Sequence, residues 1–296
     1  MKRWAAPLAL LLLISLASCQ PPDEGHSKAI IGAVLIDGSG GPQVSDSVVI
    51  VAAGRIAYAG PRNAADIPPN ADKIDGSGKY LVPAPVDAYK SPDLKASFTA
   101  AGAAPQGAMT PATPDEATRQ VATLEAHKPE AIHIWPEKMS RPVAEALMEA
   151  ARSAEIPITG HISTQAEARL MVDGGASRLV GMIRDTADLD DSLVTKMRDL
   201  RIVVAPALSS GPPSDIARQN TRRLFAAGVP MAVASSGGDL VHEAELMVDA
   251  GIPPLDVIVA ASRGGGIVVG KPADMLLLSA NPGQDIGNLR RTVKLW

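Results

Sequence analysis

The sequence AIHIWPEKMSRPVAEALMEAARSAEIPITGH, residues Ala131–His161, decides the fold class. It begins with a short apolar run, AIHIW, and ends with a second one, IPITGH. Between them, residues 141–154 place apolar side chains at helical spacing among charged ones. A strand-like run, an amphipathic helix and another strand-like run form the pattern of a β–α–β unit, whose two strands are parallel.

The same alternation recurs along the central part of the chain. Thr113 to Glu116 combines an N-cap, a proline at the first helical position and a capping-box acid, and Thr164 to Glu167 is a second capping box. Helices are predicted at residues 113–127, 141–154, 164–174, 190–200 and 214–227. Strands are predicted to end near Asp87, Trp135, His161, Met182, Ala205 and Ser235. We therefore expect an α/β fold with a parallel sheet, open or closed into a barrel.

The composition excludes some partners. Formal net charge is -4, and no run of five or six basic residues occurs, so nucleic acid is not an expected partner. Aromatic residues are scarce, with three Trp, three Tyr and two Phe. A surface that stacks sugars or bases is therefore not expected.

The first residues have the layout of a secretory signal peptide. Lys2 and Arg3 form a short basic segment, and residues 5–14 are apolar apart from one proline. This apolar run is too short to span a bilayer as a helix. The stretch LASC, residues 16–19, resembles the lipobox of bacterial lipoproteins. The resemblance implies cleavage before Cys19 and acylation of that residue; the alternative is an ordinary secretory signal with an incidental cysteine near its cleavage site.

The resemblance to a lipobox implies a location at the cell envelope. We expect residues 1–18 to be the signal peptide and the polar residues 19–27 to be a tether. More than one acyl chain gives durable membrane anchoring. Gln20 follows the cysteine where an inner-membrane retention signal usually has aspartate, so we expect an outer-membrane lipoprotein facing the periplasm. Cys19 is the only cysteine, which excludes a disulfide within the subunit.

A series of stretches resembles the amidohydrolase superfamily, closest to its imidazolonepropionase and Xaa-Pro dipeptidase branch. The stretches run in family order from Ala33 to Pro282 and are AVLIDGSGGP, VVIVAAGRIAYAG, IDGSGKYLVPAPVDA, AIHIW, ITGH, AAGVPMAV, ELMVDAGIPPLDVIVAAS and GKPADMLLLSANP. The resemblance implies a (β/α) barrel, a small β-sandwich built from both ends of the chain, and metal-dependent hydrolysis.

The barrel that the resemblance implies is incomplete. The sandwich would comprise residues 28–82 and 270–296, and the barrel residues 83–269. Eight barrel units typically need about 250 residues, and this chain has fewer. The segment Ser91–Ala112 is rich in Ala, Gly and Pro and is predicted to be loop. We therefore expect an incomplete (β/α) TIM-type barrel, whose open sheet edges are covered by a loop, another subunit or an envelope partner.

Most metal ligands of the implied site are replaced. In the family the first barrel strand ends Asp-x-His-x-His, with both histidines on one strand face. Here Tyr89 and Ser91 follow Asp87 at those positions. Neither side chain is one of the imidazole, thiolate or carboxylate ligands that zinc prefers. His133 stands where a bridging carboxylated lysine would fall, and His161 keeps the histidine of the next strand.

The later ligand positions are also changed. Gly181 stands where the family has another histidine, and Ser236 stands where it has the metal-binding aspartate that acts as general base. Asp87 matches a residue that orients ligands, and Asp185 is a possible acid without a family role. Three further histidines are expected to be surface or packing residues: His26, His127 and His242.

Two imidazoles without a base fall short of a catalytic zinc site, which needs three protein ligands and a bound water. His133 and His161 are therefore vestigial candidates, and each could equally be a buried histidine with one hydrogen-bond partner. No cofactor is expected under this interpretation.

Two functions remain open. The first is an envelope lipoprotein that keeps the amidohydrolase frame for binding or assembly without catalysis. The second is a metal-dependent hydrolase of carbon–nitrogen bonds, in amides, cyclic amides or dipeptides, with zinc in a rebuilt site. Ligand counting favours the first, and family resemblance favours the second.

Replacing the lipobox cysteine tests the anchor. Because the acyl chains hold the protein on the membrane, Cys19→Ala is expected to move it from the membrane fraction into the soluble periplasm. Fractionation followed by immunoblotting measures this. An unchanged membrane fraction would rule out the lipobox interpretation.

Overall fold

The computed structural model describes residues 27–88, 96–101, 105, 107–124, 126, 128–235, 238–262 and 266–296. Several residues singled out above lie outside the described part: the signal peptide, Cys19, Gln20, His26, Tyr89, Ser91, His127 and Ser236. Within the described ranges, no helix is both long and apolar enough to cross a membrane.

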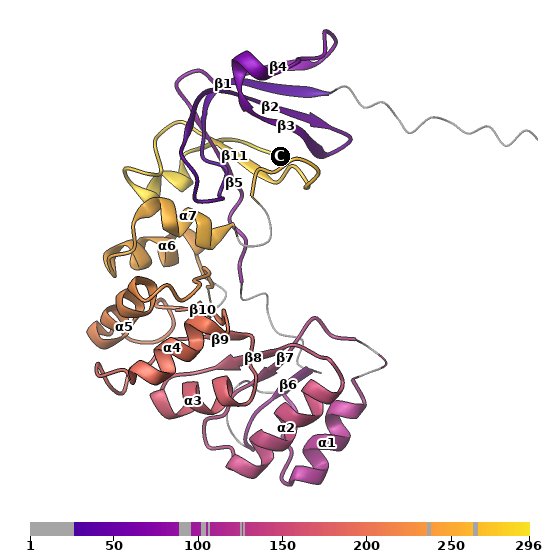
Figure 1. The fold of residues 1–296 in the computed structure, drawn as a ribbon, viewed down its shortest axis with the longest axis vertical. Coiled ribbons are helices and arrows are strands. Elements are labelled where there is room, and N and C mark those ends of the chain that lie inside the picture. Colours follow the sequence, from indigo (N-terminus) through magenta and orange to yellow (C-terminus); the bar gives the residue numbers. More distant parts are fainter. Residues whose placement is uncertain are drawn as a thin grey trace, which may run out of the picture.

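Sheet A has seven strands and combines segments from both ends of the described chain (Figure 1). Its strands are β1 (Lys28–Leu35), β2 (Val44–Ala52), β3 (Arg55–Pro61), β4 (Asp72–Asp75), β5 (Tyr80–Pro83), β11 (Met275–Leu278) and β12 (Thr292–Leu295). The order is β12-β11-β5-β1-β2-β3, with β4 paired to β1. The pairs β1–β4 and β1–β5 are parallel and the others are antiparallel, so the sheet is mixed.

Within the described residues, sheet B has five strands in the order β10-β9-β8-β7-β6, all parallel. They are β6 (Ser97–Phe98), β7 (Ile132–Ile134), β8 (Ile158–His161), β9 (Arg178–Val180) and β10 (Val203–Ala205). The helices are α1 (Pro114–Ala122), α2 (Arg141–Ser153), α3 (Gln165–Asp173), α4 (Asp191–Asp199), α5 (Asp215–Ala226), α6 (Leu240–Asp249) and α7 (Pro254–Ala261). Short 3-10 turns are η1 (Arg62–Ala64) and η3 (Ile286–Arg290). The predicted parallel α/β arrangement is confirmed.

Capping hydrogen bonds form at two of the predicted helix N-termini. The Thr113 side chain accepts a hydrogen bond from Glu116 N, and Thr164 with Glu167 forms a complete capping box. Helix α1 ends at Ala122, earlier than the predicted end near residue 127. In Figure 1, α6 and α7 lie between sheet A at one end of the molecule and sheet B at the other.

Side chains alternate between the two faces of sheet B. Ile134 and Leu179 point to the helix side, where they join Leu147 of α2 and Met171 of α3 in the main apolar core. Gly160 allows α3 to approach closely, because a Cβ at this position would lie 2.7 Å from Met171 Cγ. The helix side is therefore closely packed, and the residues between these positions face the other way.

Backbone hydrogen bonds continue sheet B beyond β10. Met231 forms a parallel bridge with Val204, and Ala232 N donates to Val204 O at 2.9 Å. Ala88 N donates to Val233 O, also at 2.9 Å. The strand order therefore leads from β6 through β10 to the segments that contain Met231 and Ala88.

Two predicted barrel strands are wrong in extent. The strand predicted to end near Asp87 stops at Pro83 and pairs inside sheet A, as β5. The strand predicted to end near Ser235 is reduced to the single bridge at Met231. Beyond Pro83 the amides of Ala84, Val86 and Ala88 donate to carbonyls of three different segments, so no single partner strand continues toward Asp87.

The prediction that Ser91–Ala112 is loop rather than two barrel strands is wrong in part, because one short strand forms within the described residues of this segment. Ser97 and Phe98 form β6, which pairs in parallel with β7. Met109 N donates to Ser97 O at 2.8 Å, so this strand has a partner on its other side as well. Two buried residues give too short a signal for strand propensity, and pairing on both sides determines their conformation.

Glu243 on α6 provides a test of the packing behind β10. It is buried, and its carboxylate accepts hydrogen bonds from Leu208 N at 2.6 Å and Ser209 N at 2.8 Å. Glu243→Ala is expected to lower the free energy of unfolding by about 2–3 kcal/mol, because both amides lose a charged acceptor. Urea unfolding measures the change. The exposed Glu145→Ala, which breaks only a surface pair with Arg141, serves as control and should cost under about 1 kcal/mol. Equal losses would contradict the assignment.

Candidate functional site

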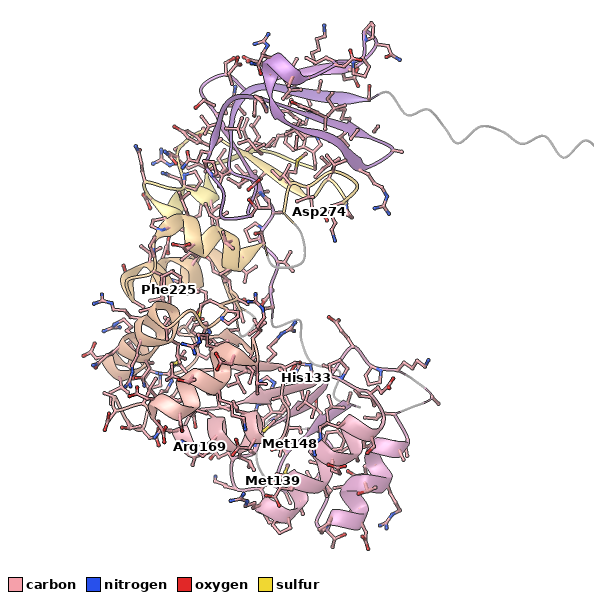
Figure 2. The ribbon with its side chains drawn as sticks, in the orientation of Figure 1. His133, Met139, Met148, Arg169, Phe225 and Asp274 are labelled. Atoms are coloured by element: carbon pink, nitrogen blue, oxygen red, sulfur yellow. The ribbon has the colours of Figure 1, made fainter. Side chains whose placement is uncertain are left out.

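The face of sheet B opposite the helices carries polar side chains, and we call it the inner face. Ser97, His133, Thr159 and Arg178 occupy paired positions on β6 to β9 and therefore form one row across the sheet. Figure 2 labels His133 on sheet B and Met148 on the neighbouring helix α2. Two residues further along the chain from His133 and Thr159, Trp135 and His161 lie on the same side and also belong to the inner face.

The two predicted histidines contact each other. His133 Nδ1 and His161 Nε2 are 3.1 Å apart, within hydrogen-bond distance. One nitrogen must donate and the other accept, so at most one of the two carries a proton at this contact. The Trp135 ring stacks on His161 with ring centroids 3.7 Å apart and planes 5° apart. His161 is therefore held between an aromatic ring and a second imidazole.

Burial keeps both imidazoles neutral. Desolvation lowers the pKa of His133, the positive charge of Arg178 lowers it further, and Glu130 partly opposes this. Desolvation holds the pKa of His161 well below its ordinary value, with a smaller contribution from His133. Both rings are therefore uncharged near neutral pH and can act as hydrogen-bonding groups or as ligands.

Arg178 and Trp135 are site residues that the sequence interpretation missed. Arg178 is half-buried, and its Nη1 donates to Ala88 O at 3.3 Å. The signal that could have found them is the period of two along a strand, which puts Trp135 on the face of His133. The same period puts Arg178 on the inner face, because the next residue, Leu179, points to the helix side.

The two predicted acids have other partners. Asp87 Oδ1 accepts from Ser235 N at 3.1 Å and Asp87 Oδ2 from Ser235 Oγ at 2.9 Å, which links residue 87 to the segment after the Met231 bridge. Asp185 Oδ1 accepts from Gln165 N at 3.0 Å, at the start of α3. Asp185 is exposed and serves the helix end.

The backbone at Gly181 excludes the histidine that the family has there. Gly181 has a φ of +97°, and a Cβ added to it would lie 2.3 Å from the Ile162 carbonyl oxygen. Gly181 N donates to Ala205 O and Ile162 N donates to Val180 O, both at 2.9 Å, so hydrogen bonds hold the two segments together. Any larger residue would force this part of the chain to move.

The family's metal centre does not fit the described residues. Among them, no group of three or more His, Cys, Asp or Glu side chains could hold a metal ion. His133 and His161 supply two nitrogens, one fewer than a catalytic zinc requires. Tyr89, Ser91 and Ser236 lie outside the described part of the chain. His242 is exposed on α6, 3.5 Å from Glu245, as expected for a surface residue.

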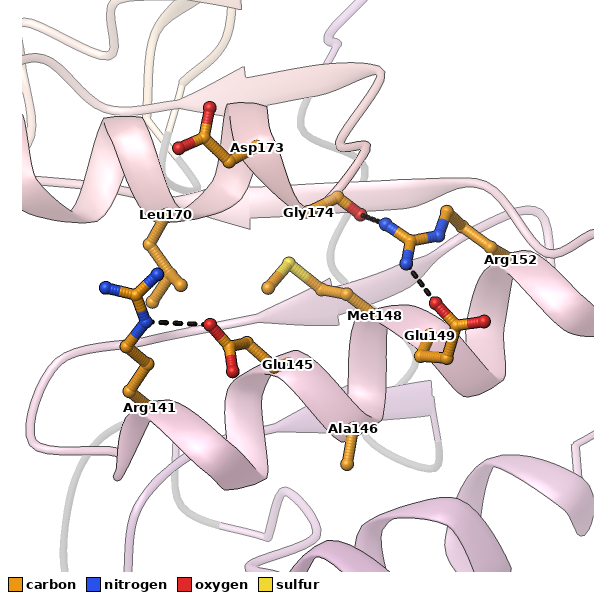
Figure 3. A pocket seen from close by; sticks show the side chains of 9 residues that line it. All are labelled: Arg141, Glu145, Ala146, Met148, Glu149, Arg152, Leu170, Asp173 and Gly174. Atoms are coloured by element: carbon orange, nitrogen blue, oxygen red, sulfur yellow. Dashed lines mark hydrogen bonds and ion pairs between the residues drawn. The ribbon is translucent and has the colours of Figure 1, made fainter.

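A groove of ≈ 440 Å³ lies between α2 and α3, on the helix side of the sheet (Figure 3). Arg141 Nε donates to Glu145 at 2.7 Å at one end. At the other, Arg152 donates to the Gly174 carbonyl at 2.7 Å and pairs with Glu149. Its two arginines pair with glutamates of the same groove, and Asp173 pairs with Lys196 outside it. The sheet separates the groove from the two histidines.

Comparison with known proteins identifies the fold. No family model and no curated protein matches the chain. Among solved structures, a Bifidobacterium longum protein assigned as a prolidase matches with a TM-score of 0.75 and 21% identity, over 92% of this chain and 93% of that one. The A. niger ochratoxinase matches with a TM-score of 0.73 and 14% identity, over 93% and 95%.

A third match, a Xaa-Pro dipeptidase with bound methionine, has a TM-score of 0.71 and 14% identity, over 91% of this chain and 98% of that one. These neighbours are amidohydrolase-superfamily members. The resemblance inferred from the sequence is thus confirmed at the level of the fold.

The neutral imidazoles predict a pH dependence of stability. Since the pKa of His133 and of His161 is lowered in the folded state, the unfolded chain binds more protons as pH falls through about 6.5. The free energy of unfolding of metal-free protein is therefore expected to decrease between pH 7 and pH 5. Urea unfolding in chelator at several pH values measures this. The double variant His133→Gln/His161→Gln should flatten the profile, whereas the exposed His242→Gln should not. A wild-type profile as flat as that of the double variant would refute the expectation.

Proposed function

We propose that this chain, which has the fold of the amidohydrolase superfamily, is an outer-membrane lipoprotein that faces the periplasm and binds or assembles rather than hydrolyses. Cys19 would carry the acyl chains that attach it to the membrane. A second copy of the chain, or an envelope protein, would cover the parts of the sheet B edges that the bridges at Met109 and Met231 leave unpaired.

The observation that carries this proposal is the backbone at Gly181. Loss of a ligand side chain can be reversed by one substitution, but the contact with Ile162 O at 2.3 Å makes this position unable to accept a histidine without movement of the chain. The contact between His133 and His161 also argues against a metal site, because one nitrogen of each imidazole is engaged by the other imidazole rather than by a metal ion.

The proposed architecture is a (β/α) barrel that lacks some of its units, with a small β-sandwich beside it. The barrel would comprise residues 83–269 and the sandwich residues 28–82 with 270–296. Support comes from the parallel order of sheet B and from the hydrogen bond of Ala88 N to Val233 O, which brings the first and last segments of the barrel together.

The alternative is a hydrolase of carbon–nitrogen bonds with a rebuilt metal site. Zinc–nitrogen bonds of about 2.0–2.1 Å place two tetrahedral ligands roughly 3.3 Å apart, close to the 3.1 Å between the two imidazole nitrogens. Neighbours of the same fold include proteins described as a molinate hydrolase and a phenylurea hydrolase. In that case His133 and His161 would each turn a nitrogen to the ion, and zinc would supply water activation.

Metal content and turnover separate the two functions. The purified protein is expected to hold zinc far below one ion per chain and to hydrolyse neither Xaa-Pro dipeptides nor simple amides. Loss of a base alone removes a factor of about 10²–10⁴ in rate, and loss of the metal removes water activation as well. Elemental analysis after zinc loading and a ninhydrin assay measure both.

His133→Gln provides the control, since it removes one of the two candidate ligands. Wild-type protein that retains one or two zinc ions, loses them in this variant, and shows an activity abolished by chelator would establish the hydrolase instead.

A further inference from the structure

Among the described residues, the half-buried Arg178 has no acidic partner. Its one hydrogen bond goes to Ala88 O at 3.3 Å, near the long limit for such a bond, although a guanidinium has five N–H donors. No carboxylate of the described residues lies within ion-pair distance of it, whereas other arginines such as Arg152 and Arg223 pair with acids. A charge withdrawn from water in this way is costly unless an anion accompanies it.

The neighbours of Arg178 on the inner face do not neutralise it. Thr159 and Val203 flank it at paired positions on β8 and β10, about 4.8 Å away across the sheet. His133, one strand further, is neutral and feels the positive charge of Arg178. Val180 follows on the same strand face. The arginine therefore sits between one hydroxyl and two short aliphatic side chains.

We propose that the inner face of sheet B binds a small monocarboxylate, with its carboxylate on the Arg178 guanidinium and its aliphatic part against the half-buried Val203. This inference deepens the proposed binding role and rests on it. The planar guanidinium fork matches a carboxylate with two parallel N–H···O bonds.

The chemistry of the face favours a carboxylate over phosphate. A phosphate dianion needs several positive or N–H donors, and the described inner face has one cation beside two neutral imidazoles. The half-buried Val203, which packs against the buried Val180 and Ala205, suits an aliphatic body rather than a second charged group. A monoanion with a short branched chain is therefore the class that fits.

Isothermal titration calorimetry of the metal-free mature lipoprotein in non-ionic detergent tests this with three probes: isobutyrate, its neutral isostere isobutyramide, and inorganic phosphate. Isobutyrate is expected to bind saturably in the millimolar range, at least about 10-fold more tightly than either of the others. Arg178→Gln should weaken isobutyrate binding by about 10-fold or more, and Arg178→Lys should give an intermediate loss because the charge remains without the fork.

Arg152→Gln is the matched control, since Arg152 also donates to a backbone carbonyl but lies on the helix side, and it should leave binding unchanged. Melting temperatures check that each variant is folded; if Arg178→Gln does not fold, Arg178→Lys decides. Equal binding of isobutyrate and isobutyramide, stronger binding of phosphate, no saturation well above the millimolar range, or unaltered affinity in the Arg178 variants would each overturn the proposal.

The same samples distinguish this inference from the proposed function. Metal-free, inactive protein that binds no isobutyrate rejects the carboxylate site alone. Isobutyrate binding that appears only after zinc loading and disappears in chelator would place the carboxylate on a metal, and would reject both.

Discussion

The period of two along the short parallel strands of sheet B is the constraint on which the site depends. On β7, Ile132 and Ile134 are fully buried against the helices, so His133 must point the other way. Because neighbouring parallel strands keep their pairing, β8 and β9 present Thr159 and Arg178 at the same level. Packing of the apolar face thus aligns the polar one. Strand pairing alone therefore brings these side chains together.

The inner face combines one fixed positive charge with groups that cannot balance it. Burial and Arg178 both disfavour a charged His133, and the ring settles as a neutral partner of His161. Trp135 then restricts the His161 ring by stacking on it. Among its described residues, the inner face therefore carries the positive charge of Arg178 without an ion pair that balances it. This arrangement suits recognition of an anion better than generation of a nucleophile, which needs a base to accept a proton.

Local sequence signals predicted the elements that depend on local physics. The caps at Thr113 and Thr164 start helices as expected, and the apolar runs of β7 to β10 form the parallel sheet. Elements that depend on distant contacts were not predictable. Strand β6 is two residues long and exists because β7 and Met109 pair with it. His133 and His161 were identified from resemblance, but their direct contact depends on side-chain orientation across two strands.

Gly181 shows that replacing a ligand side chain differs from having a backbone that leaves no room for one. At a lost histidine replaced by another side chain on the same backbone, one mutation restores the ligand. At Gly181 the left-handed φ of +97° lets the backbone run against Ile162, where no Cβ fits. The amides on both sides of that contact are hydrogen-bonded to β9 and β10, so a return to histidine would break sheet pairing as well. The backbone at this strand end therefore has no room for the ligand that the resemblance implies, and the obstacle is the path of the chain rather than the identity of one side chain.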